Sequence, residues 1–342
     1  MTVESRDRPP IVDDERAMPK LKNSSPIAIC MATDLGYAFP TAVVAKSIVQ
    51  RQCPYIGPIY FVWVDNASPP RELTNYLEKN GIILVAAQNS LLRSMAPAYP
   101  SHLTPASAAR LFLANVLEKF AIGKFLYFDG DIEIAGPLDA LAKIDLPHDH
   151  IAAVEASGLV LSTNNAKATL KWQERLHNLG MPKGASYFNA GVILAHMESW
   201  GKISVDAQKF HLENAEACLS FDQCALNAIC HDKRLVLSPK WNFQSNMFHL
   251  DVETIVAPAI VHFSGRHKPW SSVPPARPWK ARKPFLAART EMPELWKKMA
   301  LRGSVGNSYR LYRAMLRQKF MYPSNNEREI FLNYLTNTKF SG

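Results

Sequence analysis

The sequence predicts an α/β protein in which a mostly parallel central sheet is flanked by helices. Two observations support this fold class. Apolar runs alternate with stretches of helical periodicity through the first half of the chain, in the order strand, helix, strand, helix, strand. The apolar runs also contain almost no polar residues, which is typical of strands that are covered on both faces.

The apolar runs place four strands, and helical periodicity fills the intervals between them. We expect strands at about 27–32, 59–64, 82–87 and 124–128, and helices within 39–52, 68–81 and 106–120. Beyond residue 136 we expect a short strand at 191–195, a helix within 221–232 and strand-like segments at 234–243 and 258–265. Parallel α/β sheets bind ligands beyond the carboxyl ends of their strands, and Asp34, Asp65 and Asp129 follow such ends.

The composition is that of a globular protein. Of the 342 residues, 47% are hydrophobic and 20% are charged, which allows a sizeable core. The five cysteines are scattered without C-x-x-C spacing, so we expect a reducing compartment and neither a disulfide framework nor a zinc site. No apolar run reaches the roughly 18 residues of a transmembrane helix. Residues 1–24 lack the apolar run of a signal peptide and are expected to form a flexible arm.

Positive charge is concentrated near the C-terminus. The net charge is +9, and residues 266–319 contain 14 Lys or Arg against two acidic residues. We therefore expect residues 271–342 to form a basic helical region that associates with an acceptor or an anionic membrane surface. The alternative is that these helices pack on the main domain and expose basic faces. The chain has no recognisable nucleic-acid-binding module, so no nucleic-acid partner is expected.

Two aspartates follow the fourth strand in the stretch FLYFDGDIEI, residues 125–134. Asp129 and Asp131 flank Gly130, whose freedom to bend lets both carboxylates turn toward one point. Two close negative charges repel unless a cation lies between them or one is protonated. A divalent ion such as Mg²⁺ or Mn²⁺ suits them and keeps positions for substrate phosphates. The pattern points to a sugar nucleotide or another nucleoside diphosphate as ligand, and a solvated Asp-Gly-Asp turn is the alternative.

Six segments, taken together, resemble glycosyltransferase family 8. In chain order they read ATDLGYAFPTAVVAKSI, AARLFLANVL, FLYFDGDIEIAGPLDAL, YFNAGVILAHMESW, FDQCALNAI and VHFSGRHKPW, and they lie between residues 27 and 270. The resemblance implies a GT-A fold, with its Rossmann-like sheet, and a catalytic domain over residues 25–270. It also implies retaining transfer of galactose or glucose from a UDP-sugar to an acceptor hydroxyl. Lipopolysaccharide galactosyltransferases belong to this family, which implies a glycolipid or lipopolysaccharide-type glycan as acceptor.

The resemblance implies a metal site and a donor site. Asp129, Asp131 and His262 match the family's ligands for Mn²⁺, with Mg²⁺ as an alternative, and taken alone His262 would more often be a core histidine. Gly265 and Lys268 match the loop that holds the diphosphate. The other donor-binding residues that the resemblance implies are Ala32, Thr33, Asp34 and Tyr37 around the uracil, and Arg110, Gly130, Asn189 and Asp222 around the remainder of the donor.

Gln223 and Asp222 match the family's catalytic positions beside the transferred sugar. An amide is a poor nucleophile, so Gln223 favours attack by the acceptor on the face that the leaving group departs from, with Asp222 as the carboxylate that would otherwise form a covalent intermediate.

Two positions depart from the family pattern. Gly36 replaces a frequent asparagine near the base, and Ala156 replaces a sugar-binding aspartate for which Glu155 is the candidate substitute. These departures leave a non-catalytic protein that binds a sugar nucleotide as the alternative function. A glycolipid acceptor implies a cytoplasmic enzyme that is peripheral at the inner membrane face.

Overall fold

The structure is a computed structural model that describes residues 26–87, 105–163, 165–265, 268–270, 281–301 and 325–341. The N-terminal arm expected at 1–24 and much of the basic region, at 271–280 and 302–324, lie outside the described residues. The division of the chain into an arm, a main domain and a basic region therefore stays a prediction.

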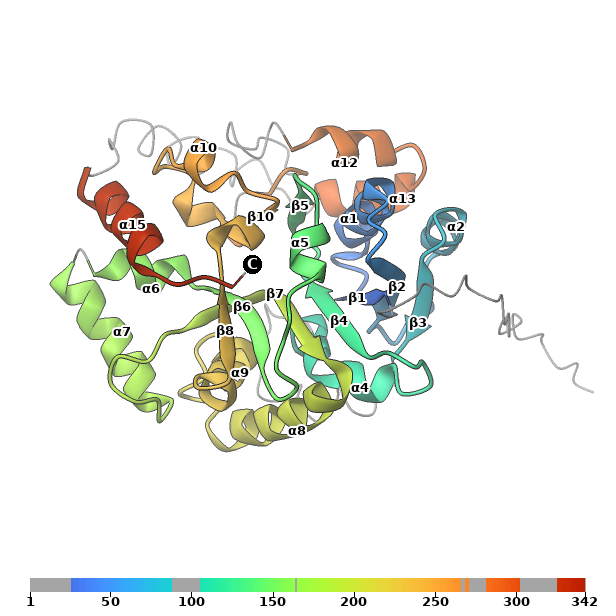
Figure 1. The fold of residues 1–342 in the computed structure, drawn as a ribbon. Helices are drawn as coiled ribbons and strands as arrows, with labels where there is room; N and C mark the ends of the chain where they lie inside the picture. The colour runs from blue at the N-terminus through green and yellow to red at the C-terminus, as the bar shows by residue number, and fades with distance from the viewer. Residues whose placement is uncertain are drawn as a thin grey trace, which may run out of the picture.

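A mostly parallel sheet forms the centre of the described chain (Figure 1). Its strands are β1 (Ile27–Thr33), β2 (Ile56–Trp63), β3 (Ile83–Ala86), β4 (Lys124–Phe128), β6 (Ile151–Glu155), β7 (Phe188–His196) and β8 (Arg234–Leu237). They are ordered β3-β2-β1-β4-β7-β6-β8, and only β7 runs antiparallel to its neighbours. The predicted fold class is confirmed, although β6 and the full length of β7 were not expected.

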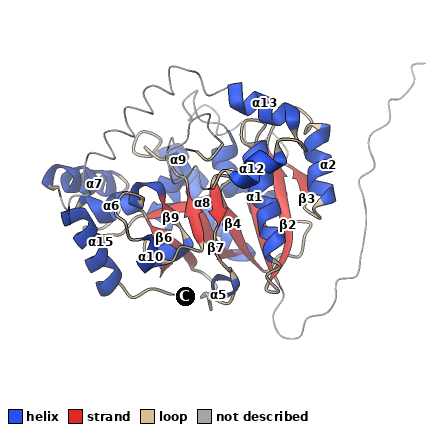
Figure 2. Cartoon of the chain, turned by 90° about the horizontal axis from the view of Figure 1, so that it is seen from above, coloured by secondary structure: helices blue, strands red, loops and turns tan. Residues whose placement is uncertain are grey.

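Alternating residues of β1 face two different helical layers. Ile27, Ile29 and Met31 pack in one hydrophobic cluster, whereas Ala28 and Cys30 pack in another. The first cluster includes residues of α1 (Ala38–Arg51), α2 (Arg71–Lys79), α5 (Asp139–Ala142), α12 (Lys283–Ala288) and α13 (Pro293–Leu301). The second includes residues of the 3₁₀ helix η2 (Pro105–Phe112), α4 (Leu113–Val116), α8 (Met197–Glu213) and α9 (Phe221–Cys230). Helices thus cover both faces of the sheet (Figures 1 and 2).

The helix expected within residues 106–120 has a different form. It is a 3₁₀ helix over Pro105–Phe112, followed by a single α-helical turn. Two backbone carbonyls in this segment accept side-chain hydrogen bonds from α8: Trp200 Nε1 donates to Arg110 O at 2.9 Å and Gln208 Nε2 to Leu111 O at 2.9 Å. Tertiary contacts thus engage carbonyls that a continuous α-helix would use internally.

A second, smaller sheet connects the two halves of the chain. It contains β5 (Ile132–Ile134), β9 (Phe243–Gln244) and β10 (Ile260–His262), ordered β5-β10-β9. β10 is antiparallel to β5, with His262 opposite Ile132. This register places His262 beside the residue that immediately precedes Ile132, which is Asp131. Two segments about 130 residues apart therefore meet at one end of the large sheet.

The described part of the C-terminal region is helical and packs on the domain. In α13 the Trp296 ring lies 5.4 Å from the ring of Phe39 in α1, between centroids. Helix α15 (Asn325–Asn337) lies against α6 (Ser157–Ser162), and its Phe331 is buried (Figure 1). The remaining helices are α7 (Ala166–Asn178), η3 (Pro239–Trp241), η4 (Ser245–Met247) and α10 (Glu253–Val256). Among the described helices, none is long and apolar enough to cross a membrane.

Candidate metal and donor site

The two aspartates of the DGD stretch lie at the carboxyl end of β4. The backbone N–H of Asp129 donates to the carbonyl of Gly191 in β7, at 2.9 Å, which ties the strand end to its antiparallel neighbour. The Tyr127 hydroxyl donates to Asp129 Oδ1 at 3.0 Å, and Arg110 Nη2 lies 3.2 Å from the same oxygen. One carboxylate oxygen of Asp129 is therefore held by protein groups, and Oδ2 is directed toward His262.

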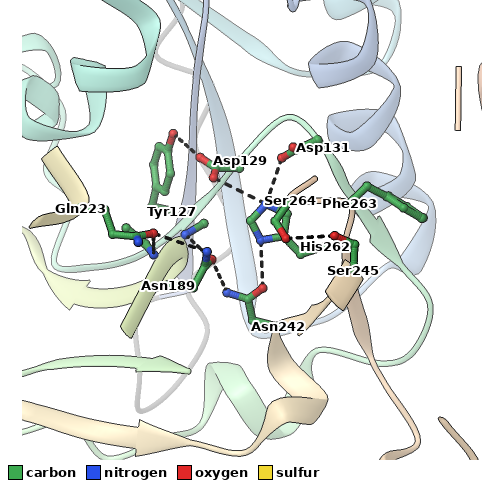
Figure 3. A network of polar contacts seen from close by, with 12 residues as sticks. Tyr127, Asp129, Asp131, Asn189, Gln223, Asn242, Ser245, His262, Phe263 and Ser264 are labelled. Atoms are coloured by element: carbon green, nitrogen blue, oxygen red, sulfur yellow. Dashed lines mark hydrogen bonds and ion pairs between the residues drawn. The ribbon is translucent and has the colours of Figure 1, made fainter. Parts of the chain in front are cut away.

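Asp129, Asp131 and His262 form a compact cluster (Figure 3). One ligand atom from each residue lies within 4.8 Å of the others. His262 Nε2 is 3.1 Å from Asp131 Oδ1 and 3.8 Å from Asp129 Oδ2. Two carboxylates and one imidazole are donors that suit Mn²⁺ and related divalent ions. The structure thus brings together the three residues predicted to bind metal.

The space around this cluster also fits an ion. A Cβ atom placed on Gly191 would lie 2.3 Å from His262 Cε1 and 2.8 Å from Asp129 Oδ2. Only a glycine leaves room there for both ligands to approach one point. The geometry of the donor set and the absence of a side chain at residue 191 therefore agree with a bound divalent cation.

Gly130 is required for a reason other than the expected one. Its φ is not in the left-handed region, so the backbone does not need the conformational freedom of glycine. A Cβ atom at this position would lie 2.1 Å from Oγ1 of Thr41 in α1. Gly130 therefore allows α1 to lie close against the DGD turn.

The ammonium group of Lys268 partly neutralises the acidic cluster. Lys268 Nζ lies 2.5 Å from Asp131 Oδ2. Burial acts to raise the pKa of Asp131, but Lys268 and His262 outweigh it and hold this pKa below its ordinary value. Burial acts to lower the pKa of Lys268, and the Asp131 carboxylate outweighs it, so this pKa lies above its ordinary value. Both groups are therefore charged at neutral pH, and an ammonium group stands beside the metal ligands.

Lys268 follows a loop that begins at the end of β10. Gly265 donates its backbone N–H to Ser245 Oγ at 3.1 Å, and Ser264 Oγ lies 3.2 Å from the same oxygen. Lys268 Nζ also donates to Phe263 O at 2.5 Å. The predicted diphosphate-binding residues Gly265 and Lys268 thus belong to one polar loop next to the metal cluster.

Arg110 connects the metal cluster to Asp222. Its Nε lies 2.6 Å from Asp222 Oδ2, and the Asp222 residue is only 4% exposed. Burial raises the pKa of Asp222 to about 6, although the guanidinium of Arg110 acts against this rise. Asp222 therefore has a tight cationic partner at the start of α9.

Gln223 and Asn189 lie next to each other at the start of β7 and α9. Gln223 Oε1 accepts the backbone N–H of Ala190 at 3.0 Å, and Asn189 Nδ2 points to the same oxygen at 3.4 Å. Gln223 Nε2 donates to the Tyr187 hydroxyl at 3.3 Å. The amide of Gln223 is thus fixed in orientation, with its oxygen directed toward β7.

The residues predicted around the base lie at the carboxyl end of β1 and directly after it. The Thr33 hydroxyl donates to the carbonyl of Asp34, and Asp34 Oδ1 accepts the N–H of Tyr37 at 3.1 Å. Tyr37 precedes α1 and is 37% exposed, with Lys268 Nζ 5.9 Å from its ring centroid. Tyr37 is therefore near the metal cluster, and Ala32 is the penultimate residue of β1. Asp65 is engaged elsewhere, since its carboxylate accepts the N–H groups of Leu35 and Ala67.

The sequence argument missed Asn242, which is fully buried and contacts both His262 and Asn189. A polar residue between the large apolar Trp241 and Phe243 is the signal that could have identified it. Glu155 is the candidate substitute for the sugar-binding aspartate of the family, which Ala156 replaces in this chain. Its carboxylate interacts with Arg234 and Tyr334.

The fold and the site together define a class of protein. Solved structures of two glycosyltransferases share the fold. They are the galactosyltransferase LgtC with donor and acceptor sugar analogues (TM-score 0.62, 21% identity, 80% of this chain and 100% of that chain) and GlyE of Streptococcus pneumoniae TIGR4 (TM-score 0.54, 21% identity, 80% and 64%). The chain therefore has the GT-A fold, and an Asp-Asp-His cluster lies at the carboxyl edge of its sheet.

The family follows from the sequence. The model of glycosyl transferase family 8 matches residues 28–273, so the chain belongs to glycosyltransferase family 8, as its motifs predicted.

Three relatives show how far the similarity extends. General stress protein A of Bacillus subtilis is 30% identical over 50% of this chain and 61% of its own length. The lipopolysaccharide glucosyltransferase WaaO of Escherichia coli K12 is 26% identical over 90% and 88%. The lipopolysaccharide 1,3-galactosyltransferase of Salmonella typhimurium LT2 is 28% identical over 57% and 58%. The chain thus spans under two thirds of the first and third relatives, and most of the second.

Proposed function

We propose that the protein is a metal-dependent, retaining hexosyltransferase. It transfers galactose or glucose from a UDP-sugar to a hydroxyl group of a glycolipid or lipopolysaccharide-type glycan. The observation that carries this proposal is the Asp129–Asp131–His262 cluster, which lies at the carboxyl edge of the sheet in a chain of glycosyltransferase family 8. Of the three relatives named above, the one that is similar over most of the chain is a lipopolysaccharide glucosyltransferase, which supports this acceptor class.

The metal cluster and Lys268 hold the leaving group. Asp129, Asp131 and His262 bind Mn²⁺ or Mg²⁺, and the ion supplies Lewis-acid stabilisation of the negative charge that grows on the departing diphosphate. Lys268 adds a positive charge from the protein, because its ammonium group stands 2.5 Å from Asp131 Oδ2. In the proposal the N–H of Gly265, which donates to Ser245 Oγ in this structure, exchanges that partner for a diphosphate oxygen.

Uridine lies on the side of Asp34 and Tyr37. In the proposal the free carboxylate oxygen of Asp34 accepts the uracil N3–H, and the exposed Tyr37 ring stacks on the base. Tyr37 lies close to Lys268. This proximity supports the placement, because the residues that bind the base and the diphosphate of one nucleotide must lie near each other.

The sugar lies on the side of Asn189, Asp222 and Gln223. We favour attack by the acceptor hydroxyl on the face from which the diphosphate departs, with a diphosphate oxygen receiving the acceptor proton. Two observations support this mechanism over a covalent intermediate. Asp222 is engaged with Arg110, and Gln223 Oε1 accepts the N–H of Ala190. A glycosyl adduct trapped on Asp222 and identified by mass spectrometry would contradict front-face attack.

A donor screen tests the proposed function. Purified protein is incubated with Mn²⁺ and either UDP-galactose or UDP-glucose, and the release of UDP is measured with and without a truncated lipopolysaccharide as acceptor. We expect one donor to be consumed faster, with release stimulated by the acceptor and a product whose mass has increased by one hexose. Binding of both donors without UDP release or product would instead support a non-catalytic sugar-nucleotide-binding protein.

The basic C-terminal residues fit an anionic acceptor. In the described part of the basic region, Trp296 and Met299 pack against the main hydrophobic cluster, so in the proposal membrane association depends on other residues. We expect flotation with anionic liposomes that weakens at high salt. Flotation that is independent of anionic lipid would contradict this part of the proposal.

A further inference from the structure

A buried asparagine lies between the metal cluster and the sugar side of the site. Asn242 falls between η3 and β9, and its residue exposure is 0%. Its neighbours Trp241 and Phe243 belong to two different hydrophobic clusters. A buried amide that lacks partners is costly, so its hydrogen bonds indicate why it is there.

Asn242 bridges two residues of the proposed site (Figure 3). Its Oδ1 is 3.0 Å from His262 Nδ1, and its Nδ2 donates to Asn189 Oδ1 at 2.8 Å. Asn189 in turn directs its Nδ2 toward Gln223 Oε1. A continuous chain of side chains thus runs from the histidine of the metal cluster to the proposed catalytic amide.

Backbone N–H groups fix the direction of every hydrogen bond in this series of side chains. The N–H of Gly191 donates to the terminal Asn189 atom that also contacts Asn242, so that atom is the oxygen. Asn242 must therefore direct its NH₂ group toward Asn189 and its oxygen toward His262. Since an amide oxygen only accepts, the Nδ1 atom of His262 must carry the proton.

This arrangement prepares His262 for metal binding. With the proton on Nδ1, the lone pair of Nε2 faces Asp129 and Asp131. A hydrogen bond from the second ring nitrogen also fixes the rotation of the imidazole, and its loss from a metal-binding histidine typically costs about 10–100-fold in metal affinity or activity.

We propose that Asn242 is a positioning residue with two separable roles. Its oxygen sets the tautomer and orientation of His262 for the metal ion, and its NH₂ group holds Asn189 and, through it, the Gln223 amide at the sugar. The inference rests on the proposed function, because it assigns Asn242 a part in the same metal and donor site.

Two substitutions separate the roles. Asn242→Ala removes both the acceptor and the donor. Asn242→Asp has nearly the same shape and keeps an oxygen that accepts the His262 Nδ1–H. Its second oxygen replaces the NH₂ group, so it cannot donate to Asn189 Oδ1 and the hydrogen bond to Asn189 is lost. The matched control is Asn227→Ala, which removes another asparagine of 0% exposure whose amide bonds to the backbone of Phe188 and Gln223.

The experiment measures the Kd of Mn²⁺ at a fixed UDP concentration, from the electron paramagnetic resonance signal of free Mn²⁺, together with kcat and KM for UDP release. We expect Asn242→Ala to weaken Mn²⁺ binding by about 10–100-fold. We expect Asn242→Asp to bind Mn²⁺ nearly as the wild type does and to lose activity in kcat. Asn227→Ala should lower the melting temperature without a change in the Kd of Mn²⁺.

Several results would overturn the inference. If Asn242→Ala and Asn242→Asp both keep the wild-type Kd of Mn²⁺ and the wild-type kcat, Asn242 has neither of the proposed roles. An Asn242→Asp variant that loses Mn²⁺ affinity as severely as Asn242→Ala would remove the acceptor role, and it can be measured even if the alanine variant does not fold. A wild-type protein that binds no Mn²⁺ in the presence of UDP would instead contradict the proposed function itself.

Discussion

At the scale of single residues, the site depends on acidic groups that the fold holds close together and partly neutralises. Arg110 contacts both Asp129 and Asp222, and Lys268 contacts Asp131. Asp131 and Asp222 lie in different environments, which lower the pKa of Asp131 and raise the pKa of Asp222. Two acidic side chains of the same intrinsic pKa can thus have different roles in one site.

The raised pKa of Asp222 predicts a pH-dependent cost. Its pKa rises from 3.8 in the unfolded chain to about 6 in the folded protein, so the fold favours the neutral form. The resulting destabilisation develops as the pH rises from about 4 and is complete by about pH 7. For metal-free protein, we expect the free energy of unfolding of Asp222→Asn, relative to wild type, to rise by about 2 kcal/mol from pH 4 to pH 7. Urea titrations measure this difference, and a difference that stays flat or falls with pH would contradict the assignment.

Gly191 gives a second prediction at this scale. Its missing side chain leaves the space in which His262 and Asp129 approach each other. Gly191→Ala should therefore weaken Mn²⁺ binding in the presence of UDP by at least about tenfold, as displaced metal ligands do. Gly201→Ala is the matched control, because the nearest atom to its new Cβ is Ala114 Cβ at 3.6 Å. The control should keep its Mn²⁺ affinity and gain up to about 1 kcal/mol of stability in α8. Equal Mn²⁺ affinities of the two variants would contradict the claim that a side chain at residue 191 displaces the metal ligands.

At the scale of elements, the short sheet β5-β10-β9 does most to build the site. The pairing of His262 with Ile132 brings a late segment of the chain beside the DGD turn, and β9 carries the residue after Asn242 to the same place. Helix α9 adds Asp222 and Gln223, and its contact with β7 places them beside Asn189. The site is thus assembled from strand ends and one helix N-terminus.

The C-terminal helix α13 is part of the folded domain. Its Leu295 is 2% exposed, and Glu72 of α2 accepts the N–H groups of Glu294 and Leu295 in its first turn. Leu295→Ala should therefore lower the free energy of unfolding by about 2–4 kcal/mol, as for other buried leucines. Lys297→Ala removes an exposed ion pair with Glu294 and should change stability by less than about 1 kcal/mol. Equal stabilities of the two variants, measured by urea unfolding, would show that α13 does not pack as described.

Sequence patterns predicted the strands of the sheet better than the connections between them. The strands β1 and β4 are buried almost throughout and β2 is buried in its second half, and all three carry apolar runs that predicted their positions. Strand β3 is only partly buried, but its apolar sequence, Ile-Leu-Val-Ala, predicted it as well. Strand β6, Ile-Ala-Ala-Val-Glu, is short and rich in alanine, and it carries no distinct signal. The 3₁₀ form of η2 depends on side chains of α8 about 90 residues away, which a local pattern does not contain.

The same limit applies to the site. Charge repulsion in the DGD motif suggested a metal ion but left a solvated turn as the alternative, and resemblance to the family supplied both the metal assignment and His262. The bonds of Asn242 could not be predicted, because they join residues 53 and 20 positions apart in sequence that meet only in the folded chain.

At the scale of the whole molecule, the protein combines an acidic cluster at the edge of its sheet with a surplus of positive charge. The net charge of +9 favours association with anionic partners at a distance, and the cluster of acids at the sheet edge selects a cation at short range. Such a surface would attract both a donor that carries phosphates and an acceptor that is anionic. This agreement between global charge and local chemistry supports the proposed transfer to a lipopolysaccharide-type glycan.

The release of UDP from a UDP-hexose in the presence of Mn²⁺ tests the central claim most directly, when wild type is compared with Asp129→Asn and Asp131→Asn. Both substitutions conserve shape while removing one negative charge from the metal cluster. The account predicts that each variant keeps its circular dichroism spectrum and loses activity by on the order of 10²–10³-fold, and that chelation of the metal abolishes wild-type release. Undiminished turnover by both folded variants, or wild-type turnover that persists after chelation, would contradict the account.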